Sequence, residues 1–267
     1  MTPAPRNHAT LSSVGNAARL LKEFRRADGD LGVTELSRRL DIGKSTAHRL
    51  ASTLAEEGLL ERDPDTGTYR LGLIIFELGA AVASHRDLHT ASLPALEKLR
   101  NLTGETVQIA VLDGREVVYV ERRDSQQSVR LFTKVGHRNF AHCTSNGKVL
   151  LAWQSDDQLT ELLTGWRLPR RTPYTITEHV ALRSELRKVR RQGFAENINE
   201  SELGTASVAA PIRNSTGEVV ASISVAGPVQ RLDGDSLQRF ARPVVESGLA
   251  ISRRLGFRDP NARSKEG

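Results

Sequence analysis

The sequence is short of cysteine and of long hydrophobic runs. Its single cysteine, Cys143, excludes a disulfide within the chain and a zinc site built from cysteines, which fits a reducing cytoplasm. No apolar run reaches the length of about 18 residues that a membrane span needs, and the N-terminus does not combine a basic start with an apolar core. We therefore expect a cytoplasmic protein with no membrane span, no metal ion and no cofactor.

Signatures of catalysis are also scarce. Residues 145–148 resemble a phosphate-binding loop, but His142 and Val149 stand where that motif needs glycine and a hydroxyl residue. Cys143 lies next to His142, yet neighbouring side chains on an extended segment point apart, which favours a buried structural cysteine. The sequence has no nucleophile elbow and no acid–base pair at a recognisable spacing. These absences predict a protein that is not an enzyme.

The chain of 267 residues is long enough for two domains, and 38% hydrophobic with 26% charged residues is typical of a globular protein. The formal net charge of +6 suggests a polyanionic partner. Residues 1–86 nevertheless carry 12 basic and 11 acidic side chains, so most of the excess lies in the remainder. Total charge therefore does not identify a nucleic-acid-binding region, and local patterning has to do so.

The clearest pattern lies in residues 34–60, which predict two short helices joined by a tight turn. Leu36 and Leu40 share one face of the first helix, and the Asp-Ile-Gly sequence at 41–43 breaks it. In the second helix apolar residues recur at spacings of three and four, which predicts an inward stripe of Ala47, Leu50, Ala51 and Leu54. The opposite face is polar, as in a recognition helix that enters the DNA major groove.

Two strand-like runs follow at residues 59–62 and 68–71, and the turn formers between them predict a hairpin. Two helices and a hairpin make a winged helix-turn-helix, although an ordinary helical hairpin with a solvated charged face is the alternative. A local basic cluster opposed only by Asp41 supports DNA binding and comprises Arg38, Arg39, Lys44, His48 and Arg49. The candidate DNA contacts are Lys44, Ser45, Thr46, His48, Arg49, Arg62 and Arg70.

Residues 73–86 predict a linker helix. Glu77 is the only charged residue between Leu73 and Ser84, so this helix is apolar nearly all round and has to be buried. We expect it to pack against a second subunit, and a core helix of the following domain is the alternative. The predicted plan is a disordered arm at 1–10, a winged helix-turn-helix at 11–72, the linker or dimerisation helix at 73–86, a second domain at 87–258 and a disordered tail at 259–267.

The second domain mixes helical and strand-like periodicity. Helices are predicted at residues 88–102, from Thr144 or Ser145 onward, and at 156–163, 177–192 and 234–255. Strands are predicted at residues 107–111, 118–120, 129–135, 194–198, 206–212 and 219–226, with 136–143 irregular. Antiparallel groups of strands with helices gathered around them favour an α+β fold over a βαβ nucleotide fold.

A binding pocket is the remaining interpretation of this domain. The N-terminus of a helix that begins at residues 144–146 favours an anion. Ser222 and Ser224 lie two apart in one strand and so face the same side of the sheet, as do Thr205 and Ser207. For each of these hydroxyls, a hydrogen bond within the protein core is as well supported as contact with a ligand.

The sequence resembles the IclR family of bacterial transcription regulators from about residue 12 to residue 256. The resemblance is carried by residues 44–50 (KSTAHRL), 69–72 (YRLG), 78–79 (LG), 142–148 (HCTSNGK), Glu200 with Gly204, and 209–212 (AAPI). It implies a winged-helix DNA-binding domain and a GAF-like effector-binding domain with an antiparallel sheet. It also implies assembly as a homodimer or homotetramer on double-stranded operator DNA. The sequence leaves open whether the protein is a repressor or an activator.

By motif position, the resemblance places the effector pocket on Leu131, Ser145, Asn146, Asn197, Thr205, Ser207, Ser222 and Ser224, and the helix start adds Gly147. Two residues depart from the family pattern: Phe140 stands where proline is usual, and Asn197 where aspartate is common. Loss of the aspartate charge suits a carboxylate ligand. We expect a small organic acid whose carboxylate lies toward residues 145–147, in a pocket without arginine or lysine.

These expectations combine into a ligand-responsive transcription regulator. Two alternatives remain at this point: an enzyme built on the effector fold, and a DNA-binding protein whose second domain only dimerises.

Overall fold

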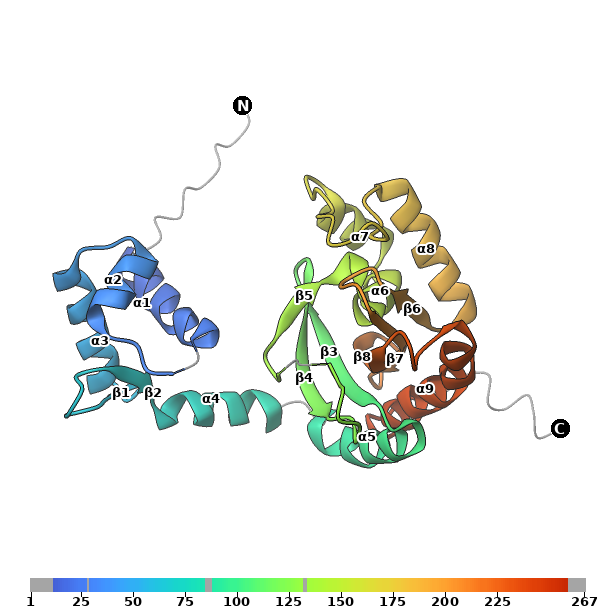
Figure 1. Cartoon of the computed structure of the whole chain (residues 1–267), viewed down its shortest axis with the longest axis horizontal. Helices are drawn as coiled ribbons and strands as arrows, with labels where there is room; N and C mark the ends of the chain where they lie inside the picture. The colour runs from blue at the N-terminus through green and yellow to red at the C-terminus, as the bar shows by residue number, and fades with distance from the viewer. Residues whose placement is uncertain (1–11, 28, 85–87, 132–133, 259–267) are drawn as a thin grey trace. The chain divides into compact units, whose positions relative to one another are not determined.

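The computed structural model describes residues 12–27, 29–84, 88–131 and 134–258 (Figure 1). They form two compact units that divide between residues 86 and 87, and each unit is described by itself. The arm and tail expected to be disordered, 1–10 and 259–267, lie outside the described residues. No described helix is long and apolar enough to cross a membrane.

The N-terminal unit is a winged helix-turn-helix, as expected. Its elements are α1 (Ser12–Glu23), the 3₁₀ turn η1 (Phe24–Arg26), α2 (Val33–Leu40), α3 (Lys44–Glu56), β1 (Leu60–Arg62), β2 (Tyr69–Leu71) and α4 (Leu73–Ser84). β1 and β2 pair antiparallel, with Leu60 opposite Leu71. The predicted inward stripe is confirmed, because Ala47 and Ala51 are fully buried in a core that also holds Leu36 and Leu40.

The turn between α2 and α3 follows from local chemistry. Asp41 adopts the left-handed conformation (φ 54°) that ends α2, and its backbone N–H donates to the carbonyl of Ser37. The Ser37 hydroxyl donates to the carbonyl of Ile42 at 2.6 Å. A side chain on Gly72 would lie 2.1 Å from the carbonyl oxygen of Gly58, so the end of the wing and the end of α3 meet only because residue 72 is glycine.

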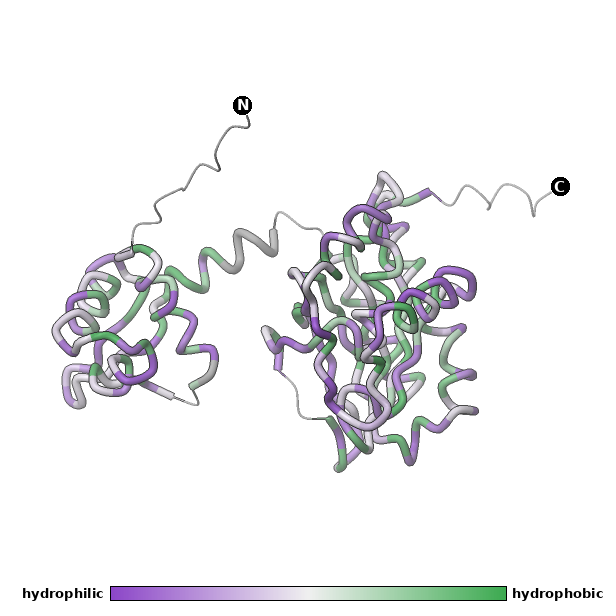
Figure 2. The backbone as a smooth tube through the Cα atoms, turned by 90° about the horizontal axis from the view of Figure 1, so that it is seen from above, coloured by the Kyte–Doolittle hydropathy of each residue, from purple (hydrophilic) through white to green (hydrophobic). Residues whose placement is uncertain are grey.

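Helix α4 differs from its expectation in one respect. Within the single chain its described side chains are not buried: Leu73 is 64% exposed, Phe76 72% and Leu78 55%. Hydrophobic colouring continues along this first half of α4 in Figure 2. The apolar composition therefore gives an open apolar surface, which is compatible with a cover outside this chain.

The C-terminal unit is built on one six-stranded antiparallel sheet of order β5-β4-β3-β8-β7-β6. The strands are β3 (Thr106–Asp113), β4 (Glu116–Arg123), β5 (Arg138–Phe140), β6 (Ala195–Ile198), β7 (Thr205–Arg213) and β8 (Val219–Pro228). The α+β expectation is confirmed, but the strand predicted at 129–135 is wrong. Residues 129–131, 134 and 135 are not in a strand, and the edge is formed by β5, inside the stretch expected to be irregular.

Helices cover both faces of this sheet (Figure 1). One face packs on α5 (Leu88–Thr103) and α9 (Gly234–Arg254). The other packs on α6 (Ser145–Ala152), α7 (Asp156–Leu163) and α8 (His179–Gln192). A short 3₁₀ turn, η2 (Ala141–Cys143), connects β5 to α6. Polar residues that lie on the second face are therefore enclosed between the sheet and α6.

Candidate functional site

The first candidate surface is the polar face of α3. Lys44, Ser45, His48 and Arg49 are exposed near the start of the helix, and Thr46 is half-buried. The opposite face of α3 is held in the core by Ala47, Ala51 and Leu54. The structure thus brings five of the seven predicted DNA contacts together on one open face, as a recognition helix requires.

Fewer basic side chains of this cluster are unpaired than the sequence suggested. Arg38 and Arg39 both bind Glu35, at 2.6 and 2.7 Å, so Asp41 is not the only acid facing the basic cluster. Hydrogen bonds from Arg38 and then Arg39 lower the pKa of Glu35 to about 2. Among the described residues, the other three members of the cluster, Lys44, His48 and Arg49, form no ion pair.

The two wing candidates differ in their surroundings. Arg70 is exposed and binds Glu61 on the paired strand at 2.9 Å, which raises its pKa. Arg62 is exposed at the end of β1, beside the turn that contains Gly67. Arg62 is thus the freer of the two for a phosphate contact.

The second candidate site is a buried network of hydroxyls and amides where α6 meets the sheet. Asn146 donates to the Ser224 hydroxyl at 2.8 Å and accepts from the Ser222 hydroxyl at 2.8 Å. The Ser145 and Ser207 hydroxyls lie 2.7 Å apart. Every member of this hydroxyl–amide network is at most 8% exposed. The hydrogen bonds within the network satisfy these buried polar groups, and contact with a ligand stays a prediction.

The start of α6 itself is shaped by local packing. The Thr144 hydroxyl accepts from the N–H of Gly147 at 3.1 Å, which confirms the predicted cap. A side chain on Gly147 would lie 2.1 Å from the carbonyl oxygen of Ala141, so this glycine lets η2 and α6 touch. This contact explains the glycine at position 147 without any ligand.

Three other predicted pocket residues have different environments. Asn197 is 3% exposed, donates to the Ser201 hydroxyl at 3.1 Å and accepts from the N–H of Glu200 at 2.9 Å, so its amide holds the turn after β6. Thr205 donates to the carbonyl of Glu202. Leu131 is half-buried, and its carbonyl accepts from Arg122 at 2.6 Å.

The pair His142 and Cys143 has no arrangement for nucleophilic catalysis. Burial raises the pKa of the Cys143 thiol to about 12, and its sulfur donates to the carbonyl of Phe140 at 3.6 Å. Burial lowers the pKa of His142, whose Nε2 lies 3.0 Å from the carbonyl oxygen of Pro169. Both are therefore structural residues of η2, as the sequence suggested for the cysteine. The described residues also contain no cluster of three potential metal ligands.

Sequence reasoning missed a buried ion cluster on α6. Lys148 is 2% exposed, and its Nζ lies 2.6 Å from Glu200 and 3.1 Å from Glu185. Lys148 and Glu200 both belong to the family motifs named in the sequence analysis. They lie 52 positions apart in the chain, so nothing in the sequence indicated that they form a pair. Lys148 is the lysine that a phosphate-binding loop would use, but it is already paired with two carboxylates. This pairing agrees with the rejection of that motif.

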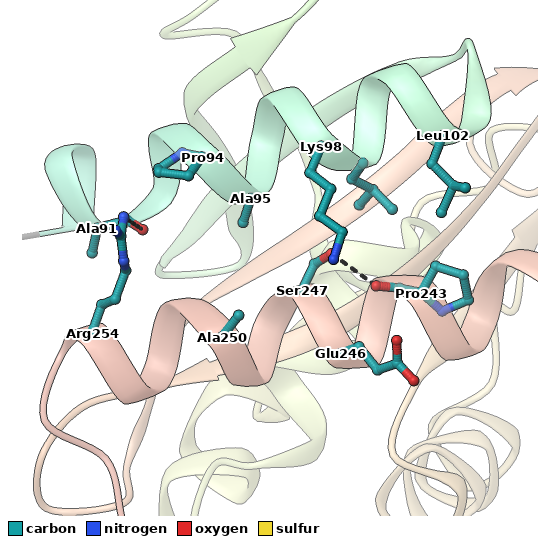
Figure 3. A pocket seen from close by; sticks show the side chains of 11 residues that line it. Ala91, Pro94, Ala95, Lys98, Leu102, Pro243, Glu246, Ser247, Ala250 and Arg254 are labelled. Atoms are coloured by element: carbon teal, nitrogen blue, oxygen red, sulfur yellow. Dashed lines mark hydrogen bonds between the residues drawn. The ribbon is translucent and has the colours of Figure 1, made fainter.

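A groove of about 240 Å³ lies between α5 and α9 (Figure 3). Lys98 reaches across it from α5, and in α9 the Ser247 hydroxyl donates to the carbonyl of Pro243 at 2.8 Å. This groove lies on the face of the sheet opposite α6, so it is separate from the hydroxyl–amide network.

Comparisons with known proteins match both units of the chain. Residues 13–64 match the IclR helix-turn-helix domain, and residues 80–253 match the C-terminal domain of the bacterial transcriptional regulator IclR. The chain is 34% identical to the regulator XynR of Escherichia coli over 92% of this chain and 98% of XynR. It is also 34% identical to the regulator KdgR of the same organism, over 86% and 88% of the two chains.

A solved structure adds a ligand to the comparison. The chain is similar to an IclR homologue from Microbacterium hydrocarbonoxydans complexed with 4-hydroxybenzoate, with a TM-score of 0.82 and 30% identity. The match covers 91% of this chain and 98% of the homologue.

Proposed function

Because the chain belongs to the IclR family, and is thus a ligand-responsive transcription regulator and not an enzyme, we propose that it is controlled by a small organic acid. In this proposal residues 11–72 bind the operator through α3 and the wing, and residues 87–258 bind the acid beside α6. Residues 73–86 join two such chains. The protein works in the cytoplasm, where operator DNA lies.

The hydroxyl–amide network supports the effector site. Ser145, Asn146 and Ser207 converge with Ser222 and Ser224 at the N-terminus of α6, where the helix dipole favours negative charge. Each of these hydroxyls can donate to a carboxylate after a small rotation. The homologue bound to 4-hydroxybenzoate, itself a carboxylate, supports an acid of comparable chemistry for this chain.

The exposed apolar surface of α4 supports an oligomer. Leu73, Phe76 and Leu78 leave a hydrophobic surface that a second copy of the same helix can cover. A dimer with two recognition helices reads two half-sites related by a twofold axis, so the operator is expected to be an inverted repeat.

A selection experiment tests the DNA-binding half of the proposal. The full-length protein is used to select from a random-sequence DNA library, and the selected DNA is then titrated at several salt concentrations. We expect an inverted repeat and an affinity that falls steeply as salt rises, because phosphate contacts release counterions. Selection of no preferred sequence would contradict the proposal.

Calorimetry tests the effector half. The full-length protein is titrated with 4-hydroxybenzoate, benzoate and acetate and with the corresponding amides. We expect micromolar to millimolar binding of at least one acid, roughly −8 to −4 kcal/mol, and weaker binding of its amide. The bound acid should also change the affinity for the selected DNA, since a regulator couples its two sites.

A further inference from the structure

A bulge in the β3–β4 pair brings an arginine to the buried face of the sheet. Ile109 pairs with Glu121 but Ala110 pairs with Tyr119, so β4 contains one extra residue, Val120, at this point. Tyr119 and Arg122 are three positions apart, and strict alternation would place them on opposite faces. The extra residue places both on the same face.

The pairing register of the strands shows that Arg122 lies on the face of the sheet that packs against α6. Arg122 is paired with Gln108, and Gln108 in turn with Ser224 of β8. Directly paired residues of antiparallel strands point to the same side of a sheet. Ser224 accepts a hydrogen bond from Asn146 of α6, so the row of Arg122, Gln108 and Ser224 faces the helix. Arg122 therefore lies in the same layer as the hydroxyl–amide network.

The guanidinium of Arg122 is buried and incompletely paired. Its side chain is 8% exposed, its Nε lies 2.5 Å from Asp124, and its Nη2 donates to the carbonyl of Leu131 at 2.6 Å. Nη1 is buried and has no hydrogen-bond partner among the residues that the structure describes. A buried charged donor without an acceptor is costly, so this nitrogen marks a position where an acceptor stabilises the protein.

The groups around Arg122 compensate its positive charge only in part. Asp124 is 59% exposed, so water screens its carboxylate while the guanidinium stays buried. Tyr119 shares the face with Arg122, and burial raises its pKa to about 12, although Asn146 and Arg122 act in the opposite direction. The phenol is therefore neutral at neutral pH and does not compensate the arginine.

We propose that Nη1 of Arg122 binds the acidic group of the effector. This inference rests on the proposed function and departs from the expectation of a pocket without arginine or lysine. Strict alternation along β4 would place Arg122 on the face opposite Tyr119, and the bulge brings it to the same face. The contact uses one end of the guanidinium, since Nε and Nη2 already bind Asp124 and the carbonyl of Leu131. The carbonyl bond also links Arg122 to a residue of the predicted pocket.

The test compares variants of the full-length protein by calorimetry with the acids and amides named above. Arg122→Gln removes the charge, and Arg122→Lys keeps it. Arg123→Gln is the matched control, because the neighbouring Arg123 binds Glu97 of α5 on the other side of the sheet. Arg122→Gln should weaken acid binding about tenfold to a hundredfold, the range for a charge-assisted hydrogen bond, and leave amide binding unchanged. Arg122→Lys should restore part of the loss, and the control should bind as the wild type does.

The possible failures are distinguishable. If the wild type prefers acids and Arg122→Gln keeps that preference in full, the role of Arg122 is wrong while the acid proposal stands. If the wild type binds amides as well as acids, or binds no probe, both proposals fail.

Asp124→Asn provides a second measurement should Arg122→Gln not fold. It leaves the arginine in place and removes its competing carboxylate, so acid affinity should rise severalfold. Unchanged or weaker acid binding by this variant would overturn the role of Arg122.

Discussion

Replacement of Lys148 by methionine should strongly destabilise the C-terminal unit. The lysine is almost fully buried between Glu200 and Glu185, whose side chains are 13% and 21% exposed. Methionine keeps the apolar stem and removes the cation, so two carboxylates remain together with little access to water. Within the described part of the chain, one oxygen of Glu200, Oε2, already has no hydrogen-bond partner.

The size of the effect follows from this burial. Removal of one partner from a buried ion pair costs about 3–5 kcal/mol, because the remaining charge is left uncompensated. For a unit of this size 1 kcal/mol shifts the melting temperature by about 2–4 °C, so Lys148→Met should lower it by roughly 6–20 °C. Lys98→Met is the control, because Lys98 is exposed and belongs to no ion pair among the described residues.

The loss should depend on pH in a defined direction. Burial raises the pKa of Glu200 above its ordinary value, and Lys148 opposes that rise. Without the lysine the pKa of Glu200 rises further, so the folded variant binds a proton that the unfolded chain releases near pH 4.5. Stability then falls as pH increases from that value through the folded pKa. The destabilisation should be smaller near pH 5 than at pH 8.

Thermal unfolding of the full-length variants at both pH values measures this. Addition of Glu200→Gln to Lys148→Met removes one uncompensated carboxylate and should recover part of the loss at pH 8. Equal melting temperatures for Lys148→Met and Lys98→Met at pH 8 would show that the buried ion cluster does not stabilise the unit. A loss that is larger at pH 5 would contradict the assigned role of Glu200.

Three further predictions concern the two functional surfaces and the linker. Arg49→Ala removes a predicted base contact and should weaken binding to the selected DNA by about 1–3 kcal/mol, as measured by fluorescence anisotropy. An unchanged affinity and sequence preference in the folded variant would contradict that contact. Phe76→Asp places a charge on the exposed apolar surface of α4 and should dissociate the oligomer in sedimentation experiments. A wild type that is already monomeric would exclude this interface. Asn197 pairs with Ser207 of the hydroxyl–amide network, so Asn197→Asp adds a negative charge beside it and should weaken acid binding in calorimetry. Tighter acid binding would contradict the carboxylate proposal.

Local patterns were sufficient for much of the N-terminal unit. The spacing of Leu36 and Leu40, the Asp-Ile-Gly break and the stripe that includes Ala47 and Ala51 all depend on residues within one or two helical turns. Such signals predicted α2, α3 and the wing with nearly the observed bounds. The partner of Arg38 and Arg39 was missed although Glu35 lies only three and four positions away, a spacing at which helical side chains meet.

The edge of the C-terminal sheet shows where local patterns end. Residues 129–135 carry the hydrophobic character of a strand, but the edge position beside β4 is taken by residues 138–140. Which segment pairs with a strand depends on competition between segments for the same hydrogen-bonding edge, and a single-segment pattern does not contain that competition.

The two-domain plan, the recognition helix, the cap of α6 and the family could be predicted from the amino-acid sequence, because each depends on residues close together in the chain or on motifs of fixed spacing. The pairing of the charges in the buried layer could not, because it depends on how the elements pack. Lys148 meets Glu200 and Glu185 through the packing of α6 on α8 and the turn after β6, and Arg122 reaches the face of Asn146 through a single extra residue in β4. Burial and strand register are properties of the assembled sheet, and they determine which cations are paired and which remain available to a ligand.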